Sequence, residues 1–265
     1  MPHQKQTSRW VRRHTLTTRV THWIWATCLF FLLLSGLQIF NAHPILYLGD
    51  QSGFDFENAI FSIGALDGRG IVTFFGLHIE TTGFLGQSDN TARAFPAWAT
   101  MPSQIDLATG RVIHFFFAWV LVGTLVVWML GAVLSGHLRQ DLVLRRADWK
   151  RLGPDLWQHL RLRFHRPKRY GPVQRLTYAA VLFGLFPLVI LTGLAMSPGM
   201  NAAMPWLPDL LGGRQTARTL HFVAAFGLFL FFIVHIAMVI LAGPLNEMRA
   251  IVTGWYRADG VEVSK

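Results

Sequence analysis

The stretch Arg218-Thr-Leu-His-Phe-Val-Ala-Ala-Phe-Gly-Leu-Phe-Leu-Phe-Phe-Ile-Val-His235 sets two histidines in an apolar run. The run continues over residues 220–242 without Asp, Glu, Lys or Arg and is long enough to cross a bilayer as one helix. Histidines inside such a span are costly without a partner, so we interpret both as functional. The fourteen residues from His221 to His235 correspond to about 21 Å of helical rise and nearly four whole turns, which predicts that both side chains share one helix face.

Three more apolar runs precede this one, and the four spans cover about residues 20–40, 112–134, 176–196 and 220–242. The first is too long for a cleaved signal peptide and carries a histidine of its own. We therefore predict an all-α membrane protein, a four-transmembrane-helix bundle built as a single domain of residues 1–265. Residues 41–110 form a long insert, in which we expect a short helix over residues 54–66 and a hairpin over residues 70–80.

The charge distribution predicts the orientation of the spans. Nineteen of the 24 Lys and Arg residues lie before the first span, between the second and third spans, or after the fourth. The positive-inside rule then places both termini and the basic loop of residues 135–175 in the cytoplasm of a bacterial inner membrane, and residues 41–110 in the periplasm. Basic residues beside apolar spans contact anionic lipid, so the net charge of +10 does not indicate a nucleic-acid partner.

Within the basic loop, apolar residues recur at helical spacing after Pro154 and as far as Phe164, between arginines. Proline suits the first turn of a helix. This pattern predicts a helix that begins at Pro154 and lies in the cytoplasmic membrane interface.

Three spans open with the same short motif, Arg19-x-x-His22, Arg111-x-x-His114 and Arg218-x-x-His221. Because successive spans run in opposite directions, His114 and His221 lie near the periplasmic face, whereas His22 and His235 lie near the cytoplasmic face. Depth alone therefore pairs His114 with His221 and His22 with His235. Two neutral imidazoles are the axial ligands of a low-spin, electron-carrying haem, so we predict two bis-histidine haem b sites with these four metal ligands.

The arginines fit the same interpretation. Arg19, Arg111 and Arg218 each lie one helical turn toward the membrane surface from a histidine, where a guanidinium can bind a haem propionate. Two alternatives stay open, because a terminal arginine can simply anchor in the interface and a membrane histidine can simply bond to a neighbouring helix.

A zinc site fits the sequence poorly, because zinc would require ligands that are clustered together. No catalytic motif is visible, so we expect no catalytic side chains and assign any chemistry to the cofactor.

These motifs, together with Gln174-Arg-Leu-Thr-Tyr178 and Leu191-Thr-Gly-Leu-Ala-Met-Ser-Pro198, resemble the bacterial cytochrome b561 and NiFe-hydrogenase b-type cytochrome superfamily. The similarity is greatest to its thiosulfate reductase cytochrome b subunit-like branch and covers nearly the whole chain. The resemblance implies a dihaem cytochrome that passes electrons between the quinone pool and a periplasmic redox protein, in relatives often a molybdopterin oxidoreductase. It also implies that quinone or quinol meets the haem near His22 and His235. The long insert departs from the small members of the superfamily and is expected to dock the partner.

Two other functions are compatible with the sequence. One is a self-sufficient membrane oxidoreductase that oxidises superoxide or reduces a metal at the periplasmic haem. The other is a transporter or haem-handling protein, although transporters usually show inverted repeats and broken helices.

Overall fold

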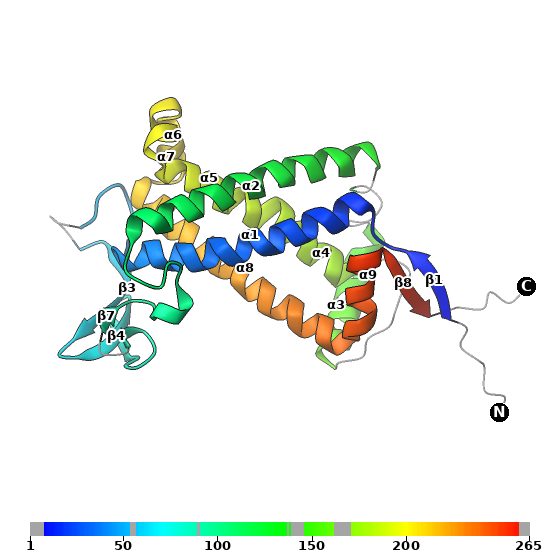
Figure 1. Ribbon diagram of the computed structural model, residues 1–265, viewed down its shortest axis with the longest axis horizontal. Helices are drawn as coiled ribbons and strands as arrows, with labels where there is room; N and C mark the ends of the chain where they lie inside the picture. The colour runs from blue at the N-terminus through cyan, green and yellow to red at the C-terminus, as the bar shows by residue number, and fades with distance from the viewer. Residues whose placement is uncertain are drawn as a thin grey trace, which may run out of the picture. The chain divides into compact units, whose positions relative to one another are not determined.

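The computed structural model of the chain describes residues 8–53, 57–88, 91–136, 138, 146–161 and 171–259. Four helical stretches in it are long and apolar enough to cross a membrane. They are α1 (Leu16–Asn41), α2 (Leu107–Leu134), the stretch Pro172–Met196 and α8 (Arg214–Ala242) (Figure 1). The predicted four-helix membrane fold is confirmed, although each helix begins four to six residues before the apolar run that identifies it.

Polar caps explain the earlier starts of α1 and α2. The Thr18 backbone N–H donates to the Thr15 hydroxyl at 3.2 Å, and the Thr109 backbone N–H donates to the Asp106 carboxylate at 3.0 Å. Such side-chain acceptors satisfy the first free N–H groups of a helix. The bonds with Thr109 lower the pKa of the Asp106 carboxyl. Both helices therefore begin at polar residues that precede the apolar runs, so the apolar runs alone place the helix starts too late.

The third membrane-length stretch is not one regular α-helix. It consists of α4 (Pro172–Ala180), the π-helical segment η3 (Val181–Leu185) and α5 (Phe186–Met196). Pro187 and Gly193 in this span favour a kink. The irregular segment ends two residues before Pro187, which lies in the first turn of α5. Proline has no N–H to donate to the preceding turn, so the helical hydrogen-bond pattern changes at this point.

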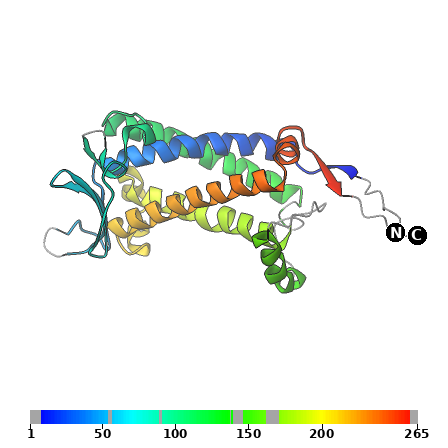
Figure 2. The same ribbon diagram turned by 90° about the horizontal axis from the view of Figure 1, so that it is seen from below.

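The chain divides into two compact units. Unit 1 comprises residues 1–24, 124–184 and 230–265, and unit 2 comprises residues 25–123 and 185–229. Within unit 1, β1 (Ser8–Arg12) pairs antiparallel with β8 (Trp255–Asp259), and α9 (Pro244–Thr253) precedes that strand (Figures 1 and 2). Val11 packs on a small core of Ala250, Tyr256 and Ala258. The single-domain organisation expected for residues 1–265 stays a prediction.

Unit 1 also contains the predicted interface helix, α3 (Arg146–Leu160). It begins at Arg146 rather than at Pro154, which lies inside the helix. Its aromatic side chains are uncovered, since Trp149 and Trp157 are 60% and 55% exposed. The end of the predicted helix, including Phe164, lies outside the described residues.

Unit 2 holds an antiparallel sheet between α1 and α2. Its strands lie in the order β2 (Ile45–Tyr47), β3 (Ala59–Leu66), β4 (Arg69–Phe74) and β5 (Leu77–Glu80). A two-stranded ribbon, β6 (Gly86–Ser88) with β7 (Thr91–Arg93), and the 3-10 helix η1 (Ala97–Ala99) follow. We call residues 45–99 of unit 2 the cap.

The hairpin predicted over residues 70–80 is confirmed by the pairing of Phe74 with Leu77. The helix predicted over residues 54–66 is wrong, because residues 59–66 form β3, and residues 54–56 lie outside the described residues. The turn Asp67-Gly68 between β3 and β4 has positive φ at both positions, 49° and 74°. Such a two-residue turn matches the twist of paired strands, so local turn chemistry favours the strand.

The cap packs onto the ends of α1 and α8 in unit 2. Leu46, Ile63 and Ala94 of the cap form one buried cluster with Phe40 of α1, and Phe222 of α8 packs against it. Two short helices, α6 (Pro198–Ala203) and α7 (Trp206–Leu210), connect α5 to α8. Portions of α1, α2, α5 and α8 run side by side within this unit (Figures 1 and 2).

The cap has a tight backbone contact that can be tested. A Cβ at Gly86, where φ is +77°, would lie 2.1 Å from the Gly64 carbonyl oxygen. We therefore expect Gly86→Ala to weaken the cap by about 2 kcal/mol or more. Tryptic cleavage at Arg69 and Arg93 should then be roughly 30-fold faster, because cleavage follows the open population.

Gly64→Ala is the matched control, since a Cβ at Gly64 meets no atom within 4 Å. Equal cleavage rates for the two variants would contradict the proposed contact.

Candidate haem-binding sites

The first candidate site lies in unit 2, between His114 of α2 and His221 of α8. The centroids of the two rings are 6.2 Å apart and the ring planes are inclined by 58°. The two histidines that were paired by depth thus lie together.

The second candidate site lies in unit 1, between His22 of α1 and His235 of α8. Its ring centroids are 6.3 Å apart and its ring planes are inclined by 52°. The ring of Trp23 meets His22 edge-on, and the ring of Phe231 stacks on His235.

The spacing of both pairs fits two axial ligands of one iron. An imidazole nitrogen binds a first-row metal at about 2 Å, so two such bonds and two ring radii of about 1.1 Å put the ring centroids about 6.2 Å apart. Among the described residues, no group of three or more His, Cys, Asp or Glu is placed to hold a metal ion. Zinc ordinarily takes three or four protein ligands. The arrangement therefore suits a haem better than a zinc ion.

Two hydroxyl side chains that the sequence does not predict as part of the site contact the first pair. The Ser35 hydroxyl of α1 lies 3.1 Å from Nδ1 of His114, and the Thr192 hydroxyl of α5 lies 3.1 Å from Nδ1 of His221. Ser35 and Thr192 are both 0% exposed. A repeated motif in the sequence could have identified these two residues, namely Leu-Ser-Gly-Leu at residues 34–37 and Leu-Thr-Gly-Leu at residues 191–194.

The second pair differs at His22. Its Nδ1 is buried and has no hydrogen-bond partner among the described residues. An unpaired nitrogen of this kind in an apolar environment is costly.

Comparison with known proteins identifies the family. Residues 13–254 match the family model described as prokaryotic cytochrome b561. The chain belongs to this family. The b561 chain is also 24% identical, over 230 residues, to the putative protein-methionine-sulfoxide reductase subunit YedZ1 of Azospira oryzae, a match that covers 86% of this chain and 90% of that protein.

The family membership confirms the coarse expectations from the sequence. This b561 protein is a multi-pass membrane cytochrome that carries b-type haem and acts in electron transfer. The number of haems and the roles of individual residues stay predictions.

The three arginines of the cytochrome have different surroundings. The Arg19 side chain donates to the carbonyl oxygen of Val252, and that of Arg111 lies 5.7 Å from the centroid of the Phe115 ring. The Arg218 side chain donates to the carbonyl oxygens of His43 and, at 2.9 Å, Ile45. A guanidinium has five N–H donors, so bonds to two carbonyls leave others for a carboxylate.

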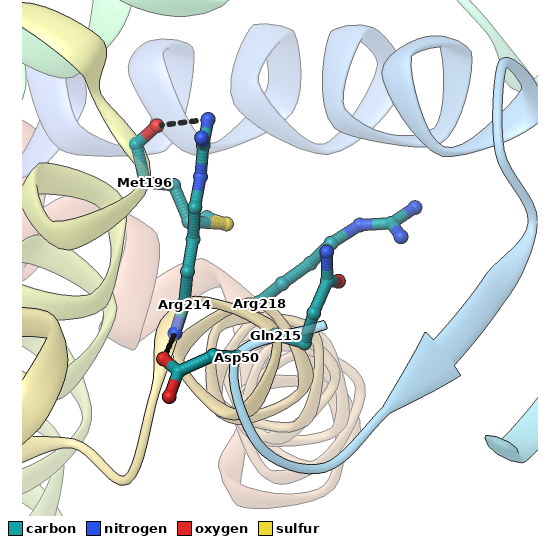
Figure 3. Close-up of a pocket in the computed structure, with 5 residues that line it drawn as sticks. All are labelled: Asp50, Met196, Arg214, Gln215 and Arg218. Carbon is teal, nitrogen blue, oxygen red and sulfur yellow. Dashed lines mark hydrogen bonds between the residues drawn. The ribbon is translucent and has the colours of Figure 1, made fainter. Parts of the chain in front are cut away.

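Arg218 also lines a pocket of about 270 Å³ together with Asp50, Met196, Arg214 and Gln215 (Figure 3). The Arg214 side chain donates to the Met196 carbonyl oxygen at 3.2 Å, and its backbone N–H donates to the Asp50 carboxylate at 3.2 Å. The guanidinium groups of Arg214 and Arg218 lie apart (Figure 3). Burial and the charge of Arg218 lower the pKa of His43 below its usual value.

Proposed function

We propose that this cytochrome holds two haems and carries electrons across the bacterial inner membrane between quinone and a periplasmic redox protein. One haem is held by His114 and His221, and the other by His22 and His235. The observation that carries the proposal is the spacing of the two histidine pairs, 6.2 and 6.3 Å between ring centroids. When bound, haem supplies one-electron redox chemistry.

The residues at the two sites suit electron transfer rather than substrate chemistry. Each histidine pair would hold its iron through two imidazoles, and a haem with two histidine ligands carries electrons without binding a substrate. We assign the four histidines to iron binding and no side chain to catalysis. Arg19, Arg111 and Arg218 would bind propionates, since each lies one turn from a histidine and carries more donors than its described contacts use.

The orientation is proposed from charge. Nineteen of 24 basic residues lie in the segments assigned to the cytoplasm, which puts both termini there. In α3, the exposed side chains of Trp149, Leu156 and Trp157 accompany arginines, as expected for a helix in the inner interface. The cap then faces the periplasm.

The cap is the proposed docking surface for the periplasmic partner. Five of its apolar side chains, on turns and short elements, are 60% to 71% exposed: Leu66, Phe75, Leu77, Phe84 and Trp98. The rings of Phe84 and Trp98 have centroids 6.4 Å apart, so these two exposed side chains share one apolar patch. A patch of this kind on a folded segment supports an interaction site. The relative's description as a reductase subunit supports a partner protein, which we take to be a molybdopterin oxidoreductase.

Haem content tests the proposal. We expect two haem b per chain by the pyridine haemochrome assay, because each histidine pair supplies two ligands. His114→Ala and His221→Ala should each remove the same haem, and His22→Ala and His235→Ala the other. His78→Ala, a change in an exposed residue of β5, should retain both.

A wild-type ratio of one or less would contradict the two-haem proposal. Loss of the same haem from His22→Ala and His221→Ala would show that the pairing is wrong.

The role of Arg218 is tested by redox titration. Removal of its positive charge in Arg218→Leu should lower the potential of the His114–His221 haem by tens of millivolts, the order that Coulomb's law gives at an effective dielectric constant of about 20. Thr219→Val is the matched control. The Thr219 hydroxyl donates to the Tyr47 carbonyl oxygen of β2, the strand to which Arg218 also donates, but it carries no charge.

If the potential of the His114–His221 haem is unchanged in Arg218→Leu, the role of Arg218 is limited to anchoring the cap. Equal shifts in the two variants would assign the effect to loosening of β2.

We place quinone at the His22–His235 haem, on the side of the membrane that the charge distribution assigns to the cytoplasm. His22→Ala that retains its other haem should be reduced by quinol at least tenfold more slowly than wild type, because the entry point for electrons is lost. Stopped-flow absorbance in proteoliposomes measures this rate. Reduction as fast as wild type would place quinone at the other haem.

A further inference from the structure

The hydroxyl of Ser35 can point its hydrogen in one direction only. It donates to the Phe31 carbonyl oxygen at 2.6 Å, and a carbonyl oxygen can only accept. The contact of 3.1 Å between the Ser35 oxygen and Nδ1 of His114 therefore requires a proton on Nδ1.

Thr192 repeats this arrangement on another helix. Its hydroxyl donates to the Leu188 carbonyl oxygen at 2.6 Å and lies 3.1 Å from Nδ1 of His221. Nδ1 of His221 must therefore carry the proton as well.

A glycine follows each hydroxyl residue and lies against the same ring. A Cβ at Gly36 would lie 3.4 Å from Cε1 of His114, and a Cβ at Gly193 would lie 3.3 Å from Cε1 of His221. The distance at Gly193 is short for a contact with a Cβ, and the distance at Gly36 is at the edge of ordinary van der Waals contact. Each ring is thus held by a hydroxyl at Nδ1 and by glycine backbone beside Cε1.

We propose that Ser35-Gly36 and Thr192-Gly193 are positioning elements that fix the tautomer and the orientation of His114 and His221. A neutral imidazole has one N–H, so a proton on Nδ1 leaves the lone pair on Nε2 for iron. The proposal rests on the proposed function, in which these two histidines hold one haem. It adds that α1 and α5, which supply no ligand to this site, determine how the ligands are presented.

The hydrogen bonds have an electronic consequence. A bond accepted from the distal N–H of a metal-bound histidine raises the basicity of the ligand. A more basic ligand favours the ferric over the ferrous state and lowers the potential. Loss of either hydroxyl should therefore raise the potential of the His114–His221 haem.

The test uses the full chain, purified from membranes with its haem. Thr192→Val keeps the branched shape and removes the hydroxyl, whereas Thr192→Ser keeps the hydroxyl. Thr177→Val is the matched control, because the Thr177 hydroxyl also donates to a carbonyl one turn back, that of Val173 at 2.9 Å. Among the described residues it makes no hydrogen bond to a histidine. The readouts are haem content, the ferric low-spin EPR signals and the potential of each haem.

We expect Thr192→Val to retain two haems, with one EPR signal shifted and one potential more positive. Ser35→Ala should shift the same signal, because both hydroxyls serve one haem. Thr192→Ser should resemble wild type, and Thr177→Val should leave both signals unchanged.

The glycines provide a second test if Thr192→Val does not accumulate. A Cβ at Gly193 and one at Gly227 would each make a 3.3 Å contact, the first with His221 and the second with Leu185. Gly193→Ala should therefore shift the same EPR signal, whereas Gly227→Ala should not.

Two failures are distinguishable. A wild-type protein with fewer than two haems would overturn the proposed function and this inference with it. Wild-type EPR signals and potentials in both Ser35→Ala and Thr192→Val, with two haems bound, would overturn the positioning role alone.

Discussion

A buried imidazole N–H must find its acceptor within the protein, and in the unit that contains His114 and His221 this constraint links the helices in pairs. In an apolar span no water is present to accept a hydrogen bond from this N–H. Ser35 and Thr192 meet the need with oxygens whose own hydrogens are already donated to their helices. The result joins α1 to α2 and α5 to α8 through polar contacts in otherwise apolar packing.

Much of the fold and the histidine pairing could be predicted because they depend on simple regularities. Runs free of charge mark the spans, successive spans run in opposite directions, and a rise of 1.5 Å per residue converts position along a span into depth. The helix starts could not be read in this way. They depend on caps such as Thr15 and Asp106, which lie in polar sequence outside the apolar runs.

The errors have a common physical source in contacts between distant residues. Ala59–Leu66 forms a strand because β2 and β4 supply its hydrogen-bond partners, although the Asp67-Gly68 dipeptide offers a local hint of the turn. Ser35 and Thr192 look like small residues in apolar helices, and their value depends on rings 79 and 29 residues away along the chain. The hydroxyl–imidazole contacts are visible in the sequence as a repeated motif, Leu-(Ser/Thr)-Gly-Leu.

The cap is attached to the same turns of α8 that lead to His221. Thr216 accepts the Gly49 N–H at 2.7 Å, Arg218 donates to His43 and Ile45, and Thr219 donates to Tyr47 at 2.7 Å. These residues precede His221 by two to five positions, so the cap and the ring share one rigid helical segment. A protein bound to the cap would therefore rest on the element that presents His221. The long insert is thus better understood as a support built onto this site than as an independent module.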